Sequence, residues 1–118
     1  MNTVIIVQAR MGSARLPGKV MKKIAGIPAV GLILKRLRKT KEADQIIVAT
    51  THSREDKVLL DYLKKIRVNY FCGNEKDVVN RFYKAASKYN AKIIVRITAD
   101  CPLVDVKIVD EFIKKFKK

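Results

Sequence analysis

Basic side chains and glycines occur together near the N-terminus, in segment 8–19, which reads QARMGSARLPGK. This segment follows a short apolar run, 4–7, of the kind that forms a buried strand. Glycine lets backbone N–H groups approach an anion closely, and loops at strand ends form anion-binding concavities. Arginine forks and lysine then neutralise phosphate charge. The pattern predicts a polyphosphate site with these candidates: Ala9, Arg10, Gly12, Ser13, Arg15 and Lys19.

Two common phosphate-binding sequences do not fit this segment. A P-loop needs a glycine where Ser13 stands and a serine or threonine where Val20 stands. Gly12 also lacks the following glycines that would complete a dinucleotide fingerprint. The alternative is a solvated, arginine-rich surface loop. The position after a strand favours a ligand site, because open α/β sheets bind ligands at the ends of their strands.

Length and composition favour one globular domain, 1–118, with 48% hydrophobic and 31% charged residues. The formal charge of +15 is compatible with an anionic partner such as nucleic acid. Lysines are, however, spread over every predicted helix, and lysine-rich surfaces are also common in heat-adapted proteins. The charge therefore supports polyanion binding only weakly.

Cysteines and apolar runs exclude several classes of protein. Cys72 and Cys101 lie far apart without a CxxC motif, so neither a disulfide framework nor a zinc site is expected. The first apolar run is too short for a signal or membrane segment, and a cytoplasmic protein is expected.

The order of strand, loop and helix predicts an α/β fold with a mostly parallel sheet and helices on both faces. Strands are expected at 4–7, 45–50, 68–71 and 92–97, with a short extended piece at 20–24. Helices are expected from Pro28 to about 39, from Ser53 to about 66, at 74–86, and from 106 to about 116. In the second helix, Ser53 and Asp56 fit a capping box, and the predicted inward side is Val58, Leu59, Tyr62 and Leu63.

Segment 73–86, GNEKDVVNRFYKAA, allows two interpretations. The first is an amphipathic helix capped by Asn74, with an ion pair between Asp77 and Arg81 and an apolar side formed by Val78, Val79, Phe82 and Ala86. The second directs the start of the helix, Gly73 and Arg81 at the same ligand as segment 8–19. Spacing alone favours the first interpretation.

Asp100 follows the strand predicted at 92–97, at the end of the sheet where segment 8–19 also begins. A carboxylate there is well placed for Mg²⁺, which binds through one or two carboxylates and substrate phosphates. Asp100 could instead be a helix cap or a turn residue, although Asp105 is the better cap for the last helix. His52 is interpreted as an ordinary loop residue, and Cys101 as a packing residue.

Three blocks together resemble the cytidylyltransferase family that activates acidic sugars, which includes the CMP-sialic acid and CMP-KDO synthetases. The blocks are QARMGSARLPGK, GNEKDVVNRFYKAA and VRITADCPLVD, and the likeness is greatest to the spore-coat polysaccharide biosynthesis protein F branch. The resemblance implies a truncated, Rossmann-like nucleotide-diphospho-sugar transferase fold. It also implies that Arg10, Ser13, Arg15 and Lys19 contact a triphosphate and that Asp100 binds Mg²⁺.

The implied reaction transfers CMP from CTP to a sugar or sugar acid, with release of pyrophosphate, in surface polysaccharide biosynthesis. Arg10, Lys19 and Asp100 are its predicted catalytic residues. Family members are about twice as long, and their later half supplies a second metal-binding aspartate, much of the sugar site and a dimerisation arm. The chain therefore resembles the nucleotide-binding half, and a homodimer remains an open expectation.

Two other functions remain open at this point. A truncated member of the family would bind nucleotide without turnover. A basic module that binds nucleic acid is the other alternative, but an aromatic content of 7% offers few stacking side chains for single strands.

Overall fold

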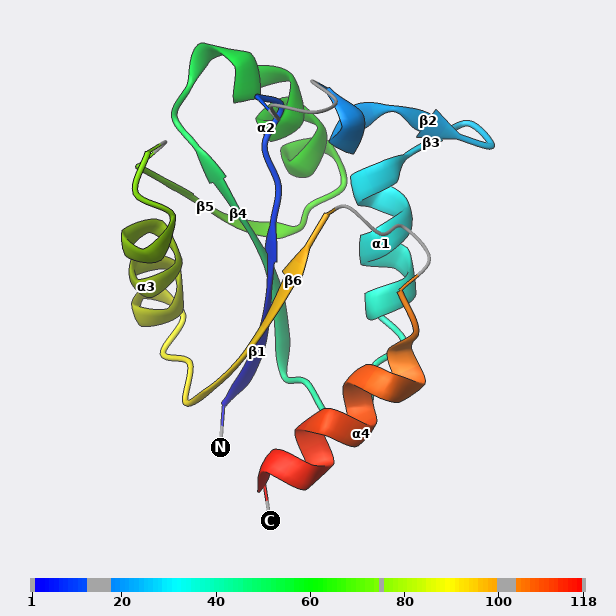
Figure 1. Cartoon of the computed structure of the whole chain (residues 1–118). Helices are drawn as coiled ribbons and strands as arrows, with labels where there is room; N and C mark the ends of the chain where they lie inside the picture. Colours follow the sequence, from blue (N-terminus) through cyan, green and yellow to red (C-terminus); the bar gives the residue numbers. More distant parts are fainter. Residues whose placement is uncertain (1, 13–17, 75, 100–103, 118) are drawn as a thin grey trace.

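The computed structural model describes residues 2–12, 18–74, 76–99 and 104–117, and its centre is a parallel sheet (Figure 1). Four strands lie in the order β5-β4-β1-β6. They are β1 (Thr3–Gln8), β4 (Gln45–Thr51), β5 (Asn69–Gly73) and β6 (Ile93–Thr98). All three pairings between them are parallel, which confirms the predicted sheet.

Helices cover both faces of this sheet, as expected for the fold (Figure 1). The helices are α1 (Ala29–Leu37), α2 (Lys57–Lys65), α3 (Val78–Lys88) and α4 (Val106–Lys117). Ile5 and Val7 of β1 pack in one apolar cluster with α1 and α2. Val4 and Ile6 pack in a second cluster with α3. Because β1 is central and covered on both faces, its side chains form a continuous apolar run rather than an alternating one.

The segment before α1 forms a small hairpin that the sequence analysis only partly predicted. A 3₁₀ helix at Lys19–Met21 precedes β2 (Lys23–Ile24), which pairs antiparallel with β3 (Ile27–Pro28). Ala25 and Gly26 have positive φ values of 53° and 85°, as a tight two-residue hairpin turn requires. Pro28 therefore ends a strand, and the prediction that it begins the helix is wrong by one residue.

The predicted capping box is half formed: the Ser53 side chain accepts from the Glu55 N–H at 3.4 Å and caps the turn that leads into α2, but Asp56 does not bond back to Ser53. A 3₁₀ turn, Arg54–Asp56, precedes the helix, and the Asp56 side chain makes no capping hydrogen bond to α2. Its carboxylate is only 1% exposed and instead accepts hydrogen bonds from the Met11 N–H and the Thr51 hydroxyl. Val58, predicted to point inward, is exposed, whereas Leu59 is buried as expected.

The predicted orientation of α3 is also wrong in two respects. Val79 is 80% exposed, whereas Arg81, expected on the solvent side, is 3% exposed. Ala85 and Ala86 pack against the sheet, and this contact sets the rotation of the helix. Asp77, rather than Asn74, caps the helix by accepting from the Asn80 N–H at 2.9 Å. The ion pairs among the described residues do not include Asp77 with Arg81.

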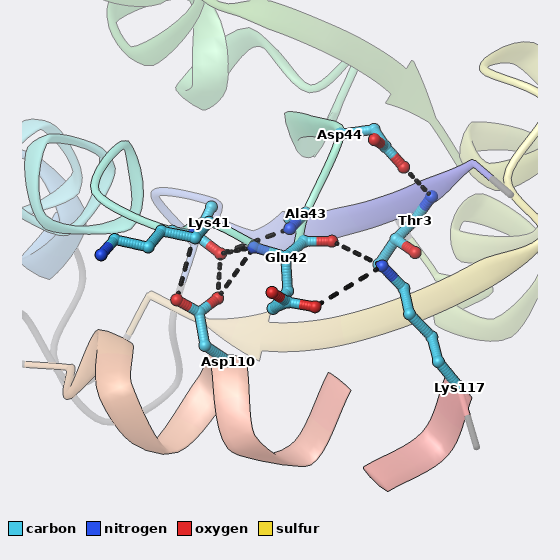
Figure 2. A network of polar contacts seen from close by, with 8 residues as sticks. Thr3, Lys41, Glu42, Ala43, Asp44, Asp110 and Lys117 are labelled. Atoms are coloured by element: carbon cyan, nitrogen blue, oxygen red, sulfur yellow. Dashed lines mark hydrogen bonds and ion pairs between the residues drawn. The ribbon is translucent and has the colours of Figure 1, made fainter. Parts of the chain in front are cut away.

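Helix α4 is attached to the loop between α1 and β4 by a polar network (Figure 2). The Asp110 carboxylate accepts from the Thr40 hydroxyl and from the N–H groups of Lys41 and Glu42, the latter two at 3.1 and 3.3 Å. The Lys117 ammonium lies 3.9 Å from a carboxylate oxygen of Glu42. Asp105 caps the helix, as predicted, by accepting from the Lys107 N–H at 2.9 Å.

The outer side of α4 carries an exposed apolar stripe, formed by Ile108, Phe112 and Phe116. β6 is an edge strand, since β1 is its one partner in the four-stranded sheet. Within the described part of the chain, the helices are too short or too polar to cross a membrane.

Candidate functional site

A cavity of about 250 Å³ lies at the carboxyl ends of β1 and β6. Four cationic side chains line it, and they come from four separate segments: Arg10 after β1, Lys19 in the 3₁₀ helix, Arg81 in α3 and Arg96 in β6. The other described lining residues are Gln8, Ala9, Val20, Val78, Thr98 and Ala99. None of the described lining residues carries a carboxylate, so this wall suits an anionic ligand.

The neck of the loop from Met11 to Gly18 brings Arg10 and Lys19 close together. The Gly18 N–H donates to the Met11 carbonyl at 2.8 Å, which closes the loop at its base. Gly18 has φ of 77°, a left-handed conformation that favours glycine. Residues 13–17 lie outside the described part of the chain, so the predictions for Ser13 and Arg15 remain predictions.

Arg81 lines the cavity, which agrees with the second interpretation of segment 73–86, the one that spacing alone did not favour. Its guanidinium donates from Nη1 to the Asn74 carbonyl at 2.8 Å. Burial lowers the pKa of Arg81, and the nearby charges of Arg10 and Arg96 lower it further, while Asp56 opposes the change. The Arg81 guanidinium nevertheless stays charged, because arginine is not deprotonated at neutral pH. Burial is the largest cause of this shift, and the smaller contributions place the charges of Arg10 and Arg96 near that of Arg81.

Gly73 and Gly12, both predicted to contact the ligand, are not among the described lining residues of the cavity. A Cβ atom on Gly73 would lie 2.7 Å from Cγ of Arg81. Glycine at this position therefore leaves room for the arginine side chain to reach the cavity. A Cβ atom on Gly12 would lie 3.0 Å from a carboxylate oxygen of Glu55.

Arg96 and Gln8 were missed as site residues by the sequence analysis. The Arg96 Nε donates to Oε1 of Gln8 at 2.9 Å, across the paired ends of β6 and β1. The buried Nε2 of Gln8 has no hydrogen-bond partner among the described residues. The sequence offered little signal for Arg96: it stands between Val95 and Ile97, but it is exposed, and an exposed arginine on a strand needs no ligand to explain it.

The predicted metal ligand, Asp100, lies outside the described residues. Its neighbour Ala99 lines the same cavity as Arg10 and Lys19. Among the described residues, no group of three histidine, cysteine, aspartate or glutamate side chains could hold a metal ion. The described wall therefore fits phosphate rather than a cation, and a magnesium site depends on Asp100.

A parallel sheet with a cationic cavity at its carboxyl edge is an arrangement in which open α/β proteins bind anionic ligands. Comparison with known families is more specific. The family model described as "Cytidylyltransferase" matches residues 4–118. The chain belongs to this family, and its structural neighbours have the nucleotide-sugar transferase fold.

Known relatives show how much of that architecture is present. The spore coat polysaccharide biosynthesis protein SpsF of Bacillus subtilis is 34% identical over 97% of this chain and 50% of its own. A solved cytidylyltransferase from Leptospira borgpetersenii is 40% identical, with a TM-score of 0.94 over 99% of this chain and 49% of that one. A CMP-KDO synthetase complexed with CTP has the same fold, with a TM-score of 0.84 at 22% identity over 99% of this chain and 48% of that one. The chain thus spans about half the length of the curated relatives it matches.

Proposed function

We propose that this chain is the nucleotide-binding part of a nucleotidyltransferase that transfers CMP from CTP to a sugar or sugar acid. The observation that carries the proposal is the convergence of Arg10, Lys19, Arg81 and Arg96 on one cavity. Membership of the cytidylyltransferase family supports cytidine as the nucleoside. The CTP complex of the CMP-KDO synthetase supports CTP as the donor. The relationship to SpsF supports a place in surface polysaccharide synthesis, and the cytoplasm is the proposed compartment.

In this reaction a hydroxyl oxygen of the acceptor attacks the α-phosphorus of CTP, and the bond from that phosphorus to the pyrophosphate oxygen breaks. The protein contributes mainly by positioning the groups and by offsetting negative charge. Arg10, Lys19 and Arg15, with donors from Gly12 and Ser13, would hold the phosphates that leave as pyrophosphate. Arg81 and Arg96 would supply positive charge from the other segments of the cavity wall.

Asp100 would hold Mg²⁺, which when bound supplies charge neutralisation at the phosphate oxygens. The described wall is cationic and offers no carboxylate, so this part of the proposal depends on Asp100 alone.

Calorimetric titration of CTP, with Mg²⁺ and with a chelator, tests this function. Lys19→Ala removes a positive charge from the cavity, and we expect CTP affinity to fall by about tenfold or more. Lys23→Ala, in the exposed strand β2, is the matched control and should leave affinity unchanged. Equal CTP affinity of wild type and Lys19→Ala would remove the loop from the mechanism. Equal CTP affinity with Mg²⁺ and with chelator would show that the metal takes no part in CTP binding.

A second candidate is nucleotide binding without turnover, because the chain spans about half the length of its relatives. Release of pyrophosphate from CTP, measured with a panel of sugars and sugar acids, separates this candidate from the enzyme. Binding without release for any acceptor would favour it.

A further inference from the structure

We infer that Asp56 is a positioning residue, which holds the neck of the 11–18 loop and thereby directs Arg10 and Lys19 into the cavity. The effect on ligand binding rests on the function proposed above, whereas the attachment itself rests on geometry. Asp56 is not among the described residues that line the cavity, so it acts through Met11 rather than by touching the ligand.

The Asp56 carboxylate joins the end of one strand to the loop that follows another. One oxygen accepts from the Met11 N–H at 2.6 Å, and the other accepts from the hydroxyl of Thr51. Thr51 is the last residue of β4, is fully buried, and accepts in turn from the Ser53 N–H at 3.1 Å. The carboxylate is therefore held in place by β4, the strand next to β1.

Both backbone groups of Met11 are engaged as a result. Its N–H donates to Asp56, and its carbonyl accepts from the Gly18 N–H at 2.8 Å. Arg10 immediately precedes Met11, and Lys19 immediately follows Gly18. Arg10 and Lys19 therefore stand on either side of the neck along the chain. The directions of their side chains depend on how firmly Met11 is held.

The burial of Asp56 indicates that its carboxylate is there to accept from the Met11 N–H. A buried aspartate is costly unless hydrogen bonds satisfy it, and a charge-assisted bond to an N–H is among the stronger ones. An aspartate preceding a helix would ordinarily cap it, yet Asp56 makes no such bond to α2. Its hydrogen bonds are directed at the loop and at Thr51 instead.

Asp56→Asn tests the inference by changing one acceptor into a donor. The amide oxygen can still accept from Met11, but the amide nitrogen cannot accept from the Thr51 hydroxyl, so that hydroxyl must turn its proton away and the charge-assisted attachment to β4 is weakened. We expect the dissociation constant for CTP to rise about tenfold. Asp61→Asn is the matched control, because Asp61 lies on α2 with its carboxylate exposed and paired with Lys57 at 3.2 Å. This control should bind CTP as the wild type does.

Two further readouts distinguish positioning from a general structural role. Amide hydrogen exchange should accelerate at Met11 and Gly18 in Asp56→Asn, while the core amides of β1 and β4 stay protected. In an Arg10→Ala background, Asp56→Asn should weaken CTP binding by much less than in the wild type, because part of its effect passes through Arg10. Fully additive losses, or unchanged exchange at Met11, would overturn the inference.

The proposed CTP binding and the proposed role of Asp56 can fail independently. If the wild-type chain binds no CTP, the proposed function fails, but exchange at Met11 still decides whether Asp56 holds the neck. Should Asp56→Asn not fold, Thr51→Val removes the hydroxyl that donates to the carboxylate and accepts from the Ser53 N–H, while keeping the shape of the buried side chain. Faster exchange at Met11 in Thr51→Val supports the inference, and unchanged exchange contradicts it.

Discussion

Two basic hollows lie at opposite ends of the sheet, and they differ in the partners of their charged side chains. The cavity at the carboxyl ends of β1 and β6 is the smaller, at about 250 Å³. The other, of about 650 Å³, lies between α4 and the α1–β4 loop at the opposite end. Its lining residues are Arg36, Lys39, Lys41, Asp105, Val106, Lys107, Asp110, Glu111 and Lys114.

The two hollows differ in their acidic side chains. In the larger one, Asp105 caps α4 and Asp110 binds Thr40, Lys41 and Glu42 (Figure 2). Arg36 is also engaged, since its Nε donates to the Val104 carbonyl at 3.0 Å. The polar groups there attach α4 to the rest of the domain. The smaller cavity gathers cations without a carboxylate among its described lining residues. Acidic partners in the larger hollow, and their absence from the described lining of the smaller one, are what distinguish the two.

The largest expected effect comes from removing a cation from the smaller cavity. Arg10→Ala should weaken CTP binding by about 10- to 100-fold, because an arginine–phosphate contact is charge-assisted and bidentate. Lys41→Ala, in the larger hollow, is the matched control and should change CTP affinity little. Calorimetric titration measures both. Similar losses in the two variants would mean that the protein's overall charge, rather than the cavity, attracts the nucleotide.

A smaller effect is expected from filling the space beside Arg81. In Gly73→Ala the new methyl group would collide with Cγ of Arg81, which must move. Overpacking of this kind costs about 1–3 kcal/mol of stability, and CTP affinity should fall with it. Thermal unfolding and CTP titration give the two values. In an Arg81→Ala background Gly73→Ala should cost less, and an equal cost would show that another contact is responsible.

The smallest effect is expected in the larger hollow, and it concerns stability rather than binding. Partial burial would raise the pKa of Asp110, but hydrogen bonds from Thr40, Lys41 and Glu42 outweigh it and lower the pKa. The stabilisation is therefore present above the ordinary carboxyl pKa of about 4 and is lost as the pH falls through the lower folded value. Asp110→Asn should cost about 1 kcal/mol at neutral pH and flatten the loss in acid.

Chemical unfolding across the acid range measures this pH dependence. Glu111→Gln, an exposed neighbour on α4, should change stability by less than about 0.5 kcal/mol at neutral pH. Asp110→Asn should leave CTP affinity unchanged. A drop in CTP affinity in Asp110→Asn would show that the larger hollow also affects nucleotide binding.

Much of the fold was predictable because its signals are local. The runs at 4–7 and 45–50 lie inside β1 and β4. The helices predicted from 28, 53, 74 and 106 are all present, although the second and third begin four residues later, at Lys57 and Val78. The basic loop was predicted to be a ligand site from its glycines and its place after a strand. Of its predicted residues, Ala9, Arg10 and Lys19 line the cavity in the structure.

The errors lie where contacts distant in sequence set the orientation of a side chain. Arg81 was interpreted as solvent-facing because its neighbours Asn80 and Lys84 are polar, yet packing of Ala85 and Ala86 on the sheet turns it inward. Asp56 was interpreted as the partner of Ser53 in a capping box because the two are three residues apart. Its partner Met11 is 45 residues away, so spacing within α2 could not reveal the contact.

The sequence by itself determined the alternation of strands and helices and the gathering of basic residues and glycines in one loop, since both depend on periodicity and on residue types close together in the chain. Only the tertiary structure decided that Arg96 and Gln8, separated by 88 positions, meet beside that loop. Parallel pairing of β1 with β6 brings their ends together, and that pairing depends on how the whole sheet is assembled.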